Sequence, residues 1–200
     1  MSSMVVDSLQ KQFGHDAGVA IAYIYCSYQP QQEQRSEDLL SSLLKQLIMR
    51  QEEIPTRIKE LYESHKDYGT RASIYEITRT LRDTVQIYSK VFIVVDALDE
   101  YHASNHEGLK ELLSAVFVLQ SQGPVNFFAT SRHIPEVASQ FDSGVTKEIR
   151  AQDDDLLQYL DGQIPKLLRS TISKHPSKLQ DTVREEIVKA ADGMWVQSRS

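Results

Sequence analysis

Apolar positions recur along this chain with two different periods. Short, continuously apolar runs rich in β-branched residues predict strands that are buried on both faces. Segments in which apolar residues recur every three or four positions predict helices that pack against a core. Strands are expected at residues 19–26, 91–95 and 125–130 and, from a weaker pattern, at 145–149.

Helical patterns fill the segments around these strands. They are expected at residues 4–13, 36–48, 74–88, 109–116 and 153 to about 192. Ser36 is expected to be an N-cap, and Ser73 with Glu76 to form a capping box. The alternation of strand and helix predicts an α/β fold in three layers, with a parallel sheet and right-handed crossovers.

Composition and charge narrow the functional classes. A hydrophobic share of 40% with 25% charged residues is that of a globular chain. The net charge of -6 and the lack of a long basic run argue against a nucleic-acid partner. The single cysteine, Cys26, is expected to be a core residue in a reducing compartment. Because the sequence shows neither a signal peptide nor a bilayer-spanning apolar run, we expect a cytoplasmic location and no membrane partner.

The predicted strand at 91–95 ends abruptly in three acids, Asp96, Asp99 and Glu100. In an open parallel sheet, ligands bind beyond the carboxyl ends of the strands. Carboxylates in that position can hold a magnesium ion through water and can orient a water for phosphoryl transfer. The alternative is that these acids only solvate the strand end and cap the next helix.

The segment VFIVVDALDE, residues 91–100, resembles the Walker B signature of the NACHT branch of the STAND-type P-loop NTPases. This resemblance implies that Asp96 is the magnesium-side acid. It also implies that Asp99 or Glu100 would position the water that attacks the nucleotide.

A second segment, NFFATSR at residues 126–132, is similar to the sensor segment of the same family. The resemblance implies that Arg132, with Thr130 beside it, contacts the nucleotide phosphates, which a guanidinium can bind in a bidentate fashion. The alternative is that Thr130 and Ser131 cap the next helix, that Pro135 occupies its first turn, and that Arg132 is a solvated surface residue.

The likeness covers most of the chain, and the segments that carry it include LQKQF, AYIYC, EDLLSSLLKQL and YLDGQI. These segments resemble the nephrocystin-like NACHT domains of large fungal proteins that often carry ankyrin repeats. The resemblance implies a nucleotide-switched signalling protein that uses magnesium with ATP or GTP and that acts through protein partners.

The chain departs from that family in its phosphate-binding loop. No Gly-x-x-x-x-Gly-Lys-Ser/Thr is present, and none of the eight glycines is followed by lysine. Without that loop no nest of backbone N–H groups can hold the β- and γ-phosphates, so we expect weak or absent nucleotide binding. We expect residues 1–150 to be a partial NACHT core and residues 151–200 a helical segment that stops before a winged-helix module.

Three functional hypotheses follow. The first is a regulatory or interaction fragment without hydrolysis of its own. The second is a working NTPase whose phosphate loop comes from an upstream segment or another chain, and the third is a pure interaction module. A zinc site at His102 and His106 has weaker support, because no further ligand cluster accompanies them.

The loss of the family's first strand has a structural consequence. That strand would lie between the strands at 125–130 and 145–149. Without it, their facing edges must close together, be covered by another segment, or stay open. An open apolar edge favours self-association.

Overall fold

The computed structural model describes residues 2–27, 34–104, 106–141, 144–149 and 196–199. The chain divides into two compact units, Met1–Lys147 with Ser198–Ser200, and Glu148–Gln197. The first unit contains the three long strands and every helix that the structure describes.

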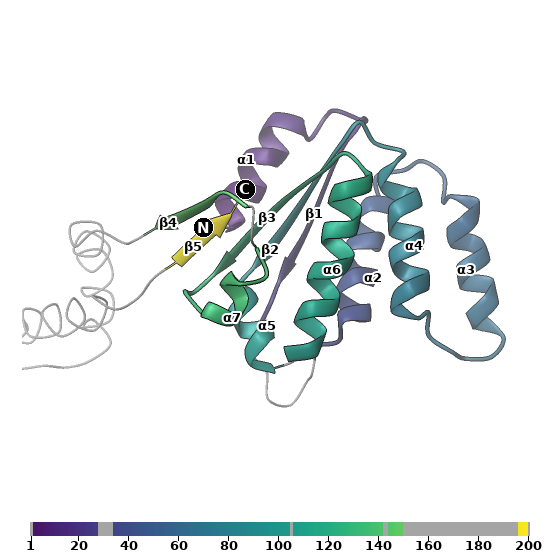
Figure 1. The fold of residues 1–200 in the computed structure, drawn as a ribbon. Helices are drawn as coiled ribbons and strands as arrows, with labels where there is room; N and C mark the ends of the chain where they lie inside the picture. The colour runs from purple at the N-terminus through teal and green to yellow at the C-terminus, as the bar shows by residue number, and fades with distance from the viewer. Residues whose placement is uncertain (1, 28–33, 105, 142–143, 150–195, 200) are drawn as a thin grey trace, which may run out of the picture. The chain divides into compact units, whose positions relative to one another are not determined.

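Three parallel strands form the centre of the sheet: β1 (Val19–Tyr25), β2 (Lys90–Asp96) and β3 (Val125–Ser131). In the register, Tyr25 lies opposite Asp96, and Val91 lies opposite Val125. The strands run side by side through the middle of the fold (Figure 1). The predicted α/β fold with a parallel sheet is therefore confirmed.

Two short strands, β4 (Thr146–Ile149) and β5 (Val196–Arg199), complete the sheet in the order β1-β2-β3-β5-β4. β4 confirms the weak strand expected at 145–149. β5 was not expected, because 151–200 was predicted to be helical, and residues 150–195 of that segment lie outside the described residues. In this order β5 lies between β3 and β4. This is the position expected for the first strand of the family, which the sequence lacks.

Helices cover both faces of the parallel strands. Three of them pack on one face: α2 (Ser36–Ile48), α4 (Ile74–Val85) and α6 (His106–Gln122). The inward residues of β2, Val91, Ile93 and Val95, belong to that core. α1 (Ser2–Phe13) lies on the other face (Figure 1). There Phe13 stacks on Phe92, with ring centroids 5.4 Å apart. This arrangement gives the three layers expected from the sequence.

Local signals at the helix ends were partly right. Ser73 and Glu76 form the predicted capping box. Ser36 is not an N-cap, because Arg35 takes that position while the buried Ser36 hydroxyl donates to Glu111 Oε2 at 2.6 Å. Pro135 begins α7 (Pro135–Ala138), so this part of the alternative interpretation of residues 130–135 is right.

Two helices have no clear sequence signal. α3 (Thr56–Lys66) has no fully buried residue, and only the partly buried Ile58 packs against the core, so its apolar stripe is narrow and weak. α5 (Leu98–Ser104) is a short helix that directly follows the acidic end of β2. Its first turn holds Asp99 and Glu100 and therefore positions the candidate site.

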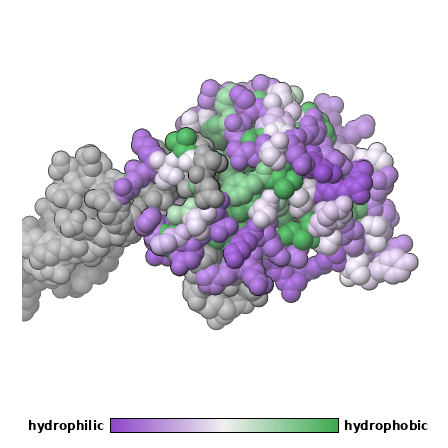
Figure 2. All heavy atoms as spheres, viewed as in Figure 1, coloured by the Kyte–Doolittle hydropathy of each residue, from purple (hydrophilic) through white to green (hydrophobic). Residues whose placement is uncertain are grey.

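The surface of the described residues is mostly polar in the view of Figure 2, with hydrophobic residues in smaller clusters. None of the helices that the structure describes is long and apolar enough to cross a membrane.

Candidate functional site

The carboxyl ends of β2 and β3 bring Asp96 and Thr130 together. The Thr130 hydroxyl donates a hydrogen bond to Asp96 Oδ1, and the Ala97 N–H donates to Thr130 Oγ1 at 3.1 Å. Thr130 is buried. It does not cap α7, whose N-cap is Ile134, so the capping alternative for Thr130 is wrong.

A second hydroxyl reaches the same carboxylate oxygen. Ser2, the first residue of α1, is fully buried, and its Oγ donates to Asp96 Oδ1 at 2.5 Å. Ser2 was not among the predicted site residues, because no local pattern links the start of α1 to a strand end 94 positions away. Among the described residues, no hydrogen bond is made to Asp96 Oδ2, so this is the oxygen that a cation or a water can use.

The turn after Asp96 has an uncommon backbone conformation. Ala97 has a φ of 56°, in the left-handed region that residues with a Cβ rarely adopt. Such a conformation costs on the order of 1 kcal/mol and is concentrated at functional sites. Here it turns the chain from β2 directly into α5, and the Glu100 N–H donates to the Ala97 carbonyl at 2.9 Å.

Asp99 and Arg132 form an ion pair that joins the segment after β2 to the segment after β3. Arg132 Nε donates to Asp99 Oδ2 at 2.6 Å, and the Arg132 backbone N–H donates to Asp99 Oδ1 at 3.0 Å. The Asp99 side chain is only 4% exposed, whereas that of Arg132 is 64% exposed. The hydrogen bond to Asp99, and then its charge, raises the pKa of Arg132. The sequence placed these residues in separate roles and did not predict the pair.

Cys26 lies at the end of β1, beside the acids. It is buried, and its backbone N–H donates to the Asp96 carbonyl at 3.0 Å. Burial raises the pKa of its thiol to about 12, and the charges of Asp96, Glu100 and Asp99 add to that effect. Cys26 is therefore a neutral core thiol, as the sequence predicted, and is unsuited to nucleophilic chemistry.

The donor set at the site suits a magnesium ion that arrives with a ligand. Within the described part of the chain, no cluster of three or more His, Cys, Asp or Glu side chains could hold a metal. Magnesium needs only one or two carboxylates when waters and substrate phosphates supply its other oxygens. Asp96 Oδ2 can be such a carboxylate oxygen.

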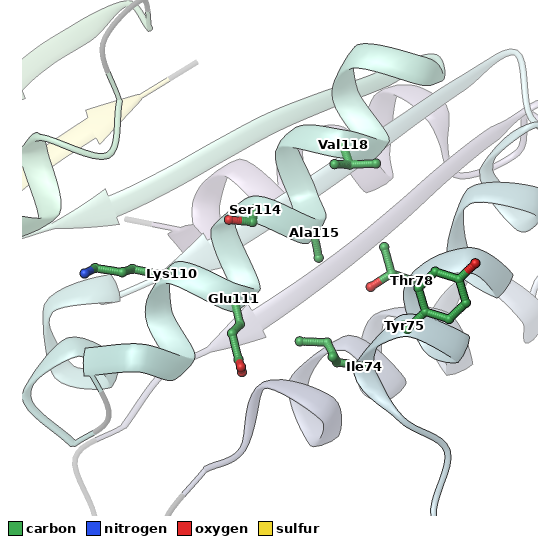
Figure 3. Close-up of a pocket in the computed structure, with 8 residues that line it drawn as sticks. All are labelled: Ile74, Tyr75, Thr78, Lys110, Glu111, Ser114, Ala115 and Val118. Carbon is green, nitrogen blue, oxygen red and sulfur yellow. The ribbon is translucent and has the colours of Figure 1, made fainter.

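A shallow groove lies apart from this site, between α4 and α6. It has a volume of about 440 Å³. Ile74, Tyr75 and Thr78 of α4 line one side, and residues of α6 including Ala115 and Val118 line the other (Figure 3). None of the predicted site residues contributes to it, so the groove is not the nucleotide site that the sequence indicated.

A comparison with models of protein families identifies the family of this chain. A family model described as "Nephrocystin 3, N-terminal" matches residues 1–132. The chain belongs to the nephrocystin 3 N-terminal family. Searches of curated proteins and of solved structures found no match. The part that matches the nephrocystin 3 N-terminal family contains all five predicted site residues, Asp96, Asp99, Glu100, Thr130 and Arg132.

Proposed function

We propose that this chain carries the magnesium and sensor side of a NACHT-type nucleotide switch, as the STAND NTPases use it, in a cytoplasmic signalling protein. In this proposal Asp96 binds the magnesium of a magnesium–nucleotide complex, and Arg132, with Thr130 beside it, contacts the terminal phosphate. The observation that carries the proposal is the convergence of two hydroxyls, those of Ser2 from α1 and Thr130 from β3, on the Asp96 carboxylate at the end of β2.

The position of α1 supports a phosphate site next to Asp96. The N-terminus of a helix carries unpaired N–H groups and a partial positive charge, which favour phosphate. Ser2 begins α1 and contacts Asp96. A phosphate-binding loop placed before Ser2 would therefore hold its phosphates beside the carboxylate that binds magnesium.

Asp96 and Glu100 have different roles in this proposal. Asp96 Oδ2 is open to magnesium, and magnesium bound there would neutralise phosphate charge. Glu100 orients the attacking water, because Asp99 is already occupied by Arg132.

The 200 residues contain no phosphate loop, so in this proposal they act as a regulatory or interaction part without hydrolysis of their own. Protein partners or self-association would carry the signal, as in the nephrocystin-like NACHT proteins of fungi. A second candidate is a functional ATPase or GTPase that receives its phosphate loop from another segment or chain. The exposed guanidinium of Arg132 and the open Asp96 Oδ2 favour this candidate.

Titration calorimetry tests the proposal. MgATP and MgGTP should bind the 200-residue chain in the millimolar range at best, because the main phosphate contacts are missing. Asp96→Ala should remove the magnesium dependence of this binding. A micromolar dissociation constant would show that the chain holds a complete nucleotide site and would contradict the fragment role.

A further inference from the structure

The buried carboxylate of Asp99 is bound twice by one residue. Its Oδ2 accepts from Arg132 Nε, and its Oδ1 accepts from the Arg132 backbone N–H. If the guanidinium left, Asp99 would remain as a buried charge with one backbone donor, which is strongly unfavourable. Arg132 is therefore expected to stay on Asp99 when a ligand arrives.

The other end of the guanidinium remains accessible. Arginine has five N–H donors in a rigid planar fork, and the pair with Asp99 uses only the one on Nε. The Arg132 side chain is 64% exposed, and within the described part of the chain neither Nη1 nor Nη2 makes a hydrogen bond. Fixing Nε fixes the plane of the fork, and that fork matches two oxygens of one phosphate group.

We propose that Asp99 is a positioning residue, which holds Arg132 so that its two Nη nitrogens bind a polyphosphate. This inference rests on the proposed function and deepens it, because it moves Asp99 from the water-orienting role to the phosphate sensor. The competing arrangement is a latch, in which Arg132 must leave Asp99 before it can bind phosphate.

The unmutated chain can decide between these arrangements. Arginine Nε–H signals are observed by ¹⁵N NMR, and Arg132→Lys identifies the signal of Arg132. On titration with inorganic tripolyphosphate, without metal, this signal should shift with millimolar affinity. At saturation its proton should still exchange slowly with water, because the bond to Asp99 is kept. A loss of that protection indicates the latch, and a signal that does not move excludes Arg132 as an anion site. Either result overturns the proposal.

Asp99→Asn gives a second test, in which the direction of the change in anion affinity distinguishes positioning from simple electrostatics. This change removes a negative charge, so simple electrostatics predicts tighter anion binding. Positioning predicts the opposite, a weakening of about fivefold or more, because the charge-assisted hydrogen bond that orders the guanidinium is lost. Glu60→Gln on the exposed face of α3 changes the net charge equally and should leave the affinity unchanged or slightly higher. Unchanged or tighter binding by Asp99→Asn overturns the proposal, and if that variant does not fold, the measurement on the unmutated chain decides.

The same signal separates this inference from the proposed function. A version of the chain with an added upstream phosphate loop is titrated with MgATP. If MgATP binds and the Arg132 signal stays in place, the positioning role fails and the nucleotide switch stands. If MgATP does not bind at all, the nucleotide switch fails, and the tripolyphosphate titration of the unmutated chain decides the positioning role separately.

Discussion

The side-chain amide of Gln46 pairs with both backbone groups of Tyr23. Gln46 Oε1 accepts from the Tyr23 N–H at 3.0 Å, and Gln46 Nε2 donates to the Tyr23 carbonyl at 2.8 Å. Among the strands that the structure describes, β1 lies at one edge of the sheet, so α2 covers part of an edge that could otherwise pair with another chain.

Gln46→Ala should therefore lower the free energy of unfolding and increase self-association. Losing two hydrogen bonds to backbone groups is worth about 1–2 kcal/mol. Ser42→Ala is the matched control, because it removes only the 3.4 Å contact between Gln46 and Ser42. Urea unfolding and concentration-dependent size-exclusion chromatography measure both effects. If the two variants had the same free energy of unfolding and the same degree of self-association, the contact between Gln46 and the edge of β1 would contribute to neither.

Arg132→Ala should destabilise the fold by about 2–4 kcal/mol, because it leaves the buried Asp99 carboxylate without its counterion. Arg71→Ala provides the comparison. Arg71 pairs with Asp38 at 3.4 Å, and both side chains are exposed, so its loss should cost less than about 1 kcal/mol. The difference between the two variants in urea unfolding checks this prediction, and similar losses would mean that the Asp99 pair contributes no more than a surface ion pair.

Cys26 should be protected from thiol reagents in the folded chain. Its pKa is about 12 against an ordinary 9.0, so at pH 8 it holds about a thousandfold less thiolate than in the unfolded chain. It is the only cysteine, so alkylation reports on this site alone. Modification should be fast in denaturant and limited by unfolding in buffer. Fast modification under native conditions would place the thiol at the surface.

The same raised pKa predicts a loss of stability at high pH. Above pH 9.0 the unfolded thiol releases its proton while the folded thiol keeps it until about pH 12. Unfolding is therefore increasingly favoured as the pH rises through this range, by up to about 1.4 kcal/mol per pH unit. Cys26→Ala lacks this contribution, so its stability should fall less steeply than that of the parent above pH 9. Parallel pH profiles would contradict the buried-thiol assignment.

Asp96 and Glu100 should have separable effects once a phosphate-binding loop is added upstream of Ser2. Asp96→Ala should weaken magnesium-dependent nucleotide binding, whereas Glu100→Gln should mainly slow turnover, by about a hundredfold or more. Calorimetry and phosphate release measure the two effects. If both variants kept hydrolysis within about twofold of the parent, a shift of roughly half a kcal/mol, these roles would be wrong.

Local chemistry was sufficient for β1, β2, β3 and β4, for most helices and for the position of the acids. A strand buried on both faces must be apolar throughout, so the three long strands are visible as continuous runs. The Ser73–Glu76 capping box is also visible, because its hydrogen bonds join residues only three positions apart.

Contacts between distant segments required the folded chain. Ser36 has the chemistry of an N-cap, but the fold brings Glu111 to its hydroxyl from 75 positions away. α3 has no fully buried residue and packs only the partly buried Ile58 against the core, so its apolar pattern is weak. Residues at the ends of β2 and β3 were recognised singly, but only strand pairing sets Asp99 against Arg132, 33 positions on. Side-chain partners at such separations depend on how strands and helices pack, and a linear pattern of apolar and polar residues does not specify that packing.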